Sequence, residues 1–428
     1  MNLTKKLLCL GFLLVLVLVP LLTAYGVLTN PIGWSAQENR ALAGKPEVSA
    51  AALWTGDTAV QTEDFLKDHL YKRNAILKFG VWFQMRVLHR PVVEDVVLGS
   101  EVLLPVAEIA DYRVGKLEKR ADAMAESLAA IQAATEDAGG QFCYVLVPEQ
   151  RSALRDYYPD WMENRAAQYD ATRAAFTAAM EAHGVAMLDL TETYRAVDDL
   201  TEYYSTVDHH YTLQGAALAY QAVCDALELP FVQPDVQVTA QAFLGTYNRK
   251  LYGLSPVSEQ FQSDFSESIP YSRWDNGERT DRPMIDASGA EAYYTAYMGG
   301  DMGETIVQTG QPELGKILIV GDSFTNAFET LCYRSFGEMR SLDFRHYSEK
   351  SLTEYIQDYQ PDVVLVMRDD LTCLNTGGLN WAYMNKILQR WQQQGFHSAE
   401  DVRTGDRKTG VPKGASGQLG EAELEAIQ

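Results

Sequence analysis

The sequence has few of the residues that staple small secreted domains or build metal centres. It holds five cysteines in 428 residues. They form no CxxC pair and no cysteine–histidine cluster with zinc spacing, so we expect neither a disulfide framework nor a metal site. Positive charge is also scarce, because 36 Lys and Arg face 58 Asp and Glu, a formal net charge of −22. This balance argues against nucleic acid, polyphosphate or an anionic membrane surface as the main partner.

Hydrophobic residues, in contrast, are plentiful, and one long apolar run lies near the N-terminus. They make up 46% of the chain, enough for one large α/β domain with additions or for two modest domains. The uncharged run from Leu7 to Leu28 follows Lys5 and Lys6. As a helix it would span roughly 33 Å, enough to cross a hydrocarbon core. The stretch "PLLTAYGV" is a poor cleavage site, so over a cleaved signal peptide we expect a signal-anchor at residues 1–30, with the lysines cytoplasmic and the remainder extracytoplasmic.

Beyond the anchor, the pattern predicts an extended and helical segment at 31–90 and then a larger domain at 91–402. From Leu117 apolar residues recur at alternating spacings of four and three, the pattern of an amphipathic helix, which Gly139 and Gly140 end. Short apolar runs typical of strands buried on both faces then alternate with helical patterns. The expected strands are 141–147, 185–190, 316–320, 341–344 and 362–367, and the expected helices are 165–183, 213–227, 324–335 and 351–359.

This alternation predicts an α/β fold in three layers, with a central parallel sheet covered by helices on both faces. Residues 230–310 lack the rhythm, and we interpret them as an irregular insertion. Residues 403–428, rich in Gly, Lys and Glu, are expected to be a disordered tail.

Two distant stretches carry residues suited to acyl-transfer chemistry. In "KILIVGDSFTN" (316–326), Ser323 follows a buried strand and begins a helix, where free backbone N–H groups can stabilise negative charge. A serine hydroxyl needs a base, and the base needs an orienting group. "STVDHHYTLQGA" (205–216) supplies Asp208 and His210, whose spacing of two directs both side chains to the same side. Either stretch alone also fits a polar turn, whereas their joint presence favours a triad.

These motifs, with others along most of the chain, resemble a known group of proteins. "GDSF" with an upstream D-x-H is similar to the SGNH hydrolase-like domain of the alginate O-acetylation proteins AlgX and AlgJ. The resemblance is closer still to the DHHW family of extracytoplasmic bacterial proteins. "QENRALAGKPE" (37–47) resembles that family's opening motif, "DHHYT" (208–212) its namesake motif, and "SLDFR" (341–345) and "PDVVLVMR" (361–368) its final strands.

The resemblance implies a role for each candidate site residue. Ser323 would be the nucleophile, His210 the base and Asp208 its orienter, in the permuted order in which Asp and His precede Ser. His209 would have a supporting or surface role. Arg345 could bind a substrate carboxylate or acetyl group, or form a structural salt bridge.

Two positions depart from the family pattern. Tyr211 replaces the usual tryptophan and could keep an aromatic wall beside the substrate. Asp301 stands where the family has an asparagine that is a candidate oxyanion donor. An ionised aspartate cannot donate a hydrogen bond, so either the backbone of Gly300 makes that contact or activity is impaired.

The resemblance further implies an extracytoplasmic, serine-dependent O-acetyltransferase or acetylesterase. Its substrate would be a cell-surface or secreted polysaccharide, its possible partner a membrane-bound O-acyltransferase, and no cofactor is expected. The alternatives are a catalytically inactive polysaccharide-binding or assembly factor on the same fold, and a plain membrane-anchored scaffold.

Overall fold

The computed structural model describes residues 3–29, 33–35, 37–38, 40–106 and 114–373. The predicted tail at 403–428 therefore lies outside the described residues. The chain forms two compact units, one from residues 1–98 and 246–256 and the other from 99–245 and 257–428. The short helix α11 (Thr246–Lys250) thus belongs with the N-terminal unit, although its sequence position falls within the predicted insertion.

The N-terminal unit is mainly helical, with α1 (Leu3–Thr29), α2 (Ala50–Thr55), α3 (Asp57–Asp68) and α4 (Arg73–Arg86). It also holds two antiparallel strand pairs, β1 (Trp34–Ser35) with β2 (Arg40–Ala41), and β3 (Val92–Val93) with β4 (Val96–Leu98). α1 is long and apolar enough to cross a membrane, as the run of leucines and valines predicts. Asp68 joins α3 to the segment before α2 through a bidentate salt bridge with Arg40, in which each carboxylate oxygen lies 2.7 Å from a guanidinium nitrogen. This salt bridge lowers the pKa of Asp68 to about 2.

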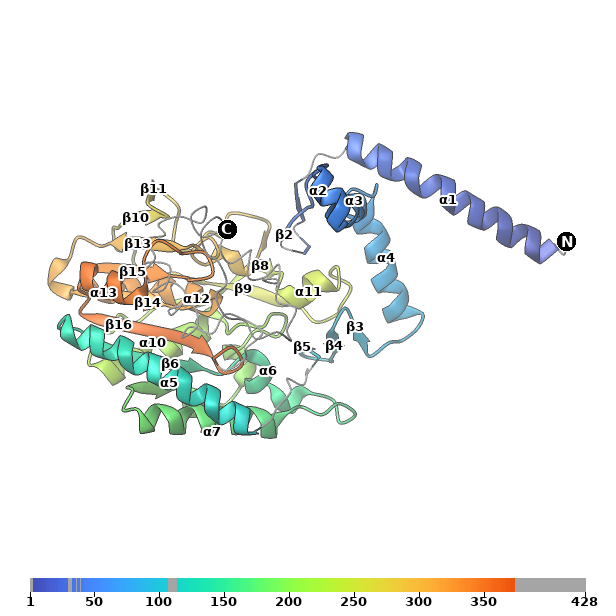
Figure 1. Cartoon of the computed structure of the whole chain (residues 1–428). Coiled ribbons are helices and arrows are strands. Elements are labelled where there is room, and N and C mark those ends of the chain that lie inside the picture. The colour runs from blue at the N-terminus through green and yellow to red at the C-terminus, as the bar shows by residue number, and fades with distance from the viewer. Residues whose placement is uncertain (1–2, 30–32, 36, 39, 107–113, 374–428) are drawn as a thin grey trace. The chain divides into compact units, whose positions relative to one another are not determined.

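The second unit is built on one eight-stranded sheet in the order β11-β10-β13-β15-β14-β16-β6-β7 (Figure 1). Five strands run parallel: β6 (Gln141–Val147), β7 (Met187–Asp189), β14 (Lys316–Val320), β15 (Glu338–Leu342) and β16 (Val363–Asp369). β6, β14 and β16 match the predicted strands closely, because each is an apolar run that is almost wholly buried. β7 is shorter than the predicted strand 185–190. β15 begins three residues before the predicted strand 341–344, because Glu338 and Arg340 interrupt its apolar pattern. β5 (Leu103–Pro105) also lies in this unit.

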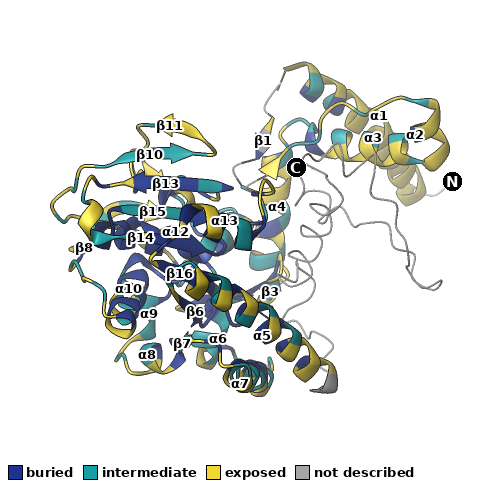
Figure 2. Cartoon of the chain, turned by 60° about the vertical axis from the view of Figure 1, so that its left-hand side comes forward, coloured by how far each residue is buried: buried dark blue, intermediate teal, exposed yellow. Residues whose placement is uncertain are grey.

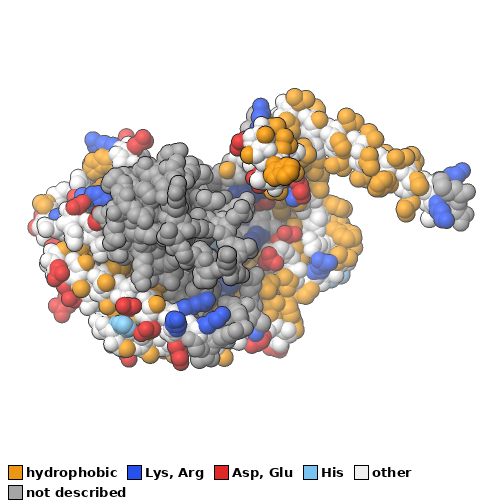
Figure 3. All heavy atoms as spheres, in the orientation of Figure 1, with side chains coloured by type: hydrophobic (Ala, Val, Ile, Leu, Met, Phe, Trp, Pro, Cys, Tyr) orange, Lys and Arg blue, Asp and Glu red, His pale blue; other side chains and the backbone are white. Residues whose placement is uncertain are grey.

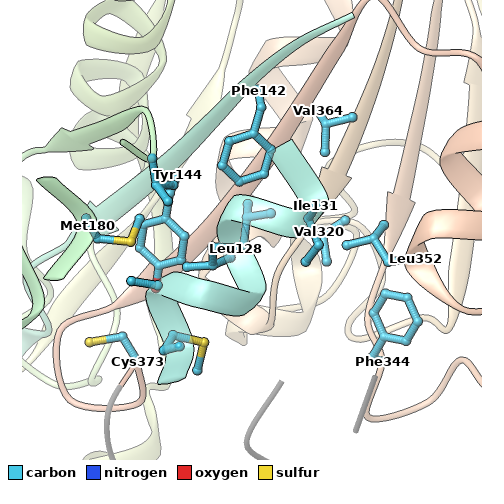
Figure 4. Close-up of a cluster of buried hydrophobic side chains, with 14 of the residues drawn as sticks. Leu128, Ile131, Phe142, Tyr144, Met180, Val320, Phe344, Leu352, Val364 and Cys373 are labelled. Atoms are coloured by element: carbon cyan, nitrogen blue, oxygen red, sulfur yellow. The ribbon is translucent and has the colours of Figure 1, made fainter. Parts of the chain in front are cut away.

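Helices cover both faces of this sheet and make the predicted three layers. α5 (Val114–Asp137), α7 (Ala166–Ala182) and α13 (Leu352–Tyr359) enclose a core with alternate residues of the parallel strands, among them Phe142, Tyr144, Val320 and Val364 (Figure 4). α10 (Leu213–Leu227) and α12 (Ser323–Cys332) pack together on the opposite face. The central strands and α12 are accordingly among the most buried elements (Figure 2).

The insertion is more regular than the sequence indicates. β10 (Ser272–Asp275), β11 (Glu278–Thr280) and β13 (Glu304–Gln308) extend the main sheet with antiparallel strands. β8 (Val236–Phe243), β9 (Glu259–Asp264) and β12 (Glu291–Ala292) form a separate three-stranded sheet. These strands mix polar and apolar residues, because one face of each is only partly covered, so they lack the apolar runs that reveal the parallel strands.

Candidate active site

Asp208 and His210 lie in a tight turn that leads into α10. The turn is closed by hydrogen bonds from the Ser205 N–H to the His210 carbonyl (3.1 Å) and from the Thr212 N–H to the Tyr203 carbonyl (2.9 Å). Thr212 then caps α10 by accepting from the N–H of Gly215. Within the turn, Oδ1 of the fully buried Asp208 lies 2.6 Å from Nδ1 of His210. The carboxylate therefore orients the ring and leaves Nε2 for another partner.

That partner is Ser323, the first residue of α12. Nε2 of His210 lies 2.8 Å from Oγ of Ser323, across 113 residues of sequence. Asp322 caps the helix by accepting from the N–H of Phe324 (3.1 Å), and its other carboxylate oxygen lies 3.4 Å from Arg368. The strand β14 ends at Val320, so Ser323 lies at the carboxyl edge of the parallel sheet, where such folds bind ligands.

The imidazole of His210 is held between two other rings. Tyr294 stacks on it almost face to face, with ring centroids 3.7 Å apart and an interplanar angle of 5°. His209 lies on it at 3.8 Å and 38°. Behind Tyr294 the contacts continue to Tyr297 and then to Phe261. Tyr294 belongs to a short 3-10 helix, η2 (Tyr294–Ala296), in the insertion, and no local signal in the sequence identifies it as part of the site.

The carboxylate of Glu259 also supports the turn that carries His210. Oε2 of Glu259 in β9 accepts from Oγ of Ser205 (2.8 Å) and from N–H and Oγ1 of Thr206 (2.7 and 3.1 Å). Burial raises the pKa of Glu259 to about 7, although these hydrogen bonds oppose the shift. Sequence reasoning also missed this residue, because a lone glutamate in an irregular stretch carries no motif.

The family-derived substrate candidates have mostly structural contacts. Tyr211 does not form a wall open to substrate: it is buried, and its hydroxyl donates to the carbonyl of Phe324 in the first turn of α12. The N–H of Gly300 donates to the carbonyl of Tyr297 (3.2 Å), so this group is already used within its turn and not held ready for an oxyanion. Both residues thus have structural partners, and the roles towards a substrate that the family pattern implies stay predictions.

Asp301 and Arg345 form one ion-paired network. Asp301 accepts from Nδ2 of Asn326 (2.8 Å) and lies 2.8 Å from the guanidinium of Arg345. Arg345 also binds Asp343 through Nε (2.9 Å). The salt bridge considered from the sequence is therefore formed, and it offsets the negative charge of Asp301. Asn326, three residues after Ser323 on α12, was not identified from the sequence.

Two groups of side chains could hold a metal ion by their spacing. In each of the sets Asp208–His209–His210 and Asp301–Asp343–His346, the ligand-type atoms lie within 4.8 Å of one another. Asp208 already accepts from His210 in the first set, and Arg345 binds both carboxylates in the second. These existing partners would compete with a metal ion at both places.

Residues 107–263 match a family model described as the SGNH hydrolase-like domain of the acetyltransferase AlgX. The matched range includes Asp208 and His210 and ends before Ser323. Residues 347–405 match a second model, described as replication initiation and membrane attachment. The described part of that range holds β16, a strand of the main sheet, and α13, a helix that packs against it. No curated protein matches the chain.

Solved structures share the fold at low sequence identity. A DHHW family protein from Eubacterium siraeum DSM 15702 aligns with a TM-score of 0.55 and 17% identity over 69% of this chain and 96% of its own. Bacillus cereus PatB1 aligns with a TM-score of 0.55 and 20% identity over 67% and 98%. A weaker likeness, with a TM-score of 0.43 and 13% identity over 69% and 99%, is to the O-acetyltransferase domain of Pseudomonas putida AlgJ. The predicted resemblance and the SGNH hydrolase-like fold are thus confirmed.

Proposed function

We propose that the chain is a membrane-anchored, serine-dependent acyl-ester enzyme that moves acetyl groups to or from a cell-surface or secreted polysaccharide. The observation that carries this proposal is the unbroken line of hydrogen bonds from Asp208 through His210 to Ser323, at 2.6 and 2.8 Å. A carboxylate, an imidazole and a partly exposed hydroxyl in this order form the arrangement that activates serine in acyl transfer.

The proposed reaction has two halves. Oγ of Ser323 attacks the ester carbonyl of the donor while its proton passes to Nε2 of His210, and the buried carboxylate of Asp208 stabilises the imidazolium. The proton then goes to the leaving alcohol as the acyl–oxygen bond breaks. In the second half a sugar hydroxyl, or water, gives its proton to Nε2 of His210 and attacks the acyl carbon. The bond between the acyl carbon and Oγ of Ser323 then breaks, and His210 returns the proton to Oγ, which restores the serine hydroxyl.

The N-terminus of α12 suits the charge that this reaction develops. The N–H of Ser323 is the first of the helix and has no acceptor within it, and the positive end of the helix dipole lies at the same place. Side chains contribute little to the stabilisation of an oxyanion, because Nδ2 of Asn326 donates to Asp301 instead. An oxyanion would therefore depend mainly on backbone donors.

We infer the acetyl group and the polysaccharide substrate from the resemblance to the family and not from the shape of a pocket. The matched family model is named for an acetyltransferase, and α1 would hold the second unit outside the membrane. The same proposal includes a membrane-bound O-acyltransferase as the partner that supplies the acyl donor.

The second candidate is an inactive polysaccharide-binding or assembly factor. The network around Asp301 favours it, because this network occupies the amide of Asn326 and the guanidinium of Arg345, while Gly300 donates within its own turn. An enzyme of this class uses such donors for the oxyanion, and removal of one can cost about 10²-fold in rate or more.

Hydrolysis of 4-nitrophenyl acetate by the full-length protein in detergent tests the catalytic role of the triad. We expect Ser323→Ala to lower the rate by about 10³-fold or more, since the nucleophile is lost. Ser288→Ala is the matched control, because it is the same substitution at an exposed serine that is not part of the triad. Equal rates for wild type and Ser323→Ala would contradict the enzyme and favour the binding factor.

A serine-directed sulfonyl fluoride provides an independent readout. One structure of Bacillus cereus PatB1 is described as carrying a sulfonyl adduct. In this chain we expect one adduct on the peptide that holds Ser323 and none in the alanine variant, by mass spectrometry. With acceptor oligosaccharide present, an acetylated oligosaccharide would identify a transferase, and free acetate alone would identify an esterase.

A further inference from the structure

The helix α4 in the N-terminal unit carries a half-exposed apolar stripe. Ile76, Phe79, Trp82, Phe83 and Val87 are 48, 62, 41, 40 and 47% exposed. At 100° per residue these five positions share one side of the helix, whereas Val81, which is 2% exposed, lies on the other side. The rings of the stripe pack on one another, with Phe79 centred 5.6 Å from Trp82 and 6.4 Å from Phe83. Figure 3 shows hydrophobic side chains gathered along α1 and α4.

The charge of this segment is opposite to that of the whole chain. Residues 71–90 contain five Lys and Arg and no Asp or Glu, although the chain as a whole carries −22. Arg73 pairs with Glu38 at 2.8 Å, and the other basic residues are Lys72, Lys78, Arg86 and Arg90. A helix with an apolar aromatic stripe and basic flanks is the type that lies in the interface of an anionic bilayer.

The start of α4 also lies next to the end of the membrane helix. Gly26 in the last turns of α1 approaches the α3–α4 turn so closely that a Cβ atom there would lie 2.1 Å from the carbonyl oxygen of His69. Tyr25 and Tyr71 meet edge to face, with centroids 4.9 Å apart. If α1 crosses the membrane, this contact holds the first residues of α4 close to the bilayer surface.

We propose that α4 is an interfacial helix that inserts its stripe into the membrane surface beside α1. The occupant of the stripe is the acyl-chain and headgroup boundary of an anionic bilayer. The net charge argues against such a surface as a partner of the whole chain, but the local charge of residues 71–90 reverses that argument for this segment. The inference rests on α1 as an anchor and is independent of the triad.

Tryptophan quenching by lipids tests this directly, because α1 contains no tryptophan. The full-length chain, with its intact mass verified, is reconstituted in phosphatidylcholine–phosphatidylglycerol vesicles with and without brominated acyl chains. We expect the wild type to be quenched and Trp82→Phe to lose a large part of that quenching. Trp161→Phe is the matched control, since Trp161 is 57% exposed in the second unit and should leave the quenching unchanged.

Both outcomes of this experiment are decisive. Equal quenching of wild type and Trp82→Phe would overturn the proposal, because the ring of Trp82 would then lie outside the bilayer. Phenylalanine keeps an apolar ring at position 82, so the far-ultraviolet circular dichroism should not change. Activity towards 4-nitrophenyl acetate in detergent should remain at the wild-type level, which separates this inference from the proposed function.

Discussion

His210 is oriented by an aromatic ring as well as by a carboxylate. Asp208 fixes one ring nitrogen, whereas Tyr294 covers a whole face of the imidazole at 3.7 Å and prevents it from tilting. Since Tyr294 is only 8% exposed, it is a positioning residue and not a substrate contact. An error of ring tilt would move Nε2 away from Ser323, and small misplacements of this kind are costly in catalysis.

We therefore predict that Tyr294→Leu lowers kcat for 4-nitrophenyl acetate by about tenfold with little change in KM. Tyr294→Phe, which keeps the ring, should restore the wild-type kcat. Tyr297→Leu is the control, because Tyr297 is similarly buried and is the next ring along but does not stack on His210. A purely structural role would lower kcat equally in both leucine variants and in proportion to their loss of thermal stability.

At the scale of elements, the connection from β14 to α12 decides where the serine lies. Glycine is the only residue type that fits at position 321 without a shift of its neighbours. A Cβ atom there would lie 2.2 Å from Cγ2 of Thr325 and 2.9 Å from the carbonyl oxygen of Met367. The closeness of this turn sets the first residue of α12 against the turn that carries His210.

Gly321→Ala should thus displace the first turn of α12, lower the free energy of unfolding by about 1–3 kcal/mol and reduce ester hydrolysis. Adding Thr325→Ser removes the methyl group that the new Cβ meets and keeps the hydroxyl that donates to the carbonyl of Asp322. The double variant should recover part of both losses, since the contact with Met367 remains. Chemical denaturation and initial rates measure the two effects. No recovery in the double variant would show that the methyl contact is not what makes glycine necessary.

At the scale of the whole molecule, buried carboxyl groups make stability depend on pH. Burial raises the pKa of Glu259 from 4.5 to about 7, and that of Asp370 from 3.8 to about 7. Between the ordinary pKa and about 7 the folded state binds more protons than the unfolded state. The contribution of each group to stability is therefore present below its ordinary pKa and is lost as the pH rises through the folded pKa.

We predict that the free energy of unfolding falls between about pH 4.5 and pH 7, and that Glu259→Gln flattens part of this fall. Urea denaturation at a series of pH values measures the slope. Glu313→Gln is the control, because Glu313 is exposed and its replacement should leave the slope as it is. The same slope in Glu259→Gln and wild type would exclude Glu259 as a source of the pH dependence.

The sequence alone was sufficient to predict the features that depend on residues close together along the chain. The parallel strands β6, β14 and β16 are recognisable as apolar runs because both of their faces are buried, and α1 is recognisable by the long uncharged run that follows its two lysines. The spacing of Asp208 and His210, and a serine directly after a buried strand, are likewise local. The resemblance then linked the two stretches into one expected site.

Tertiary structure alone decided which groups meet across the insertion and what they are free to do. Tyr294 and Glu259 support the turn of His210 only because η2 and β9 fold back against it, and a tyrosine that stacks on an imidazole looks like any other buried tyrosine in the sequence. Tyr211, Gly300 and Arg345 have partners that no spacing reveals. The reason is physical: a residue type limits the hydrogen bonds and contacts that a side chain can make, and only the folded chain selects the partners that receive them.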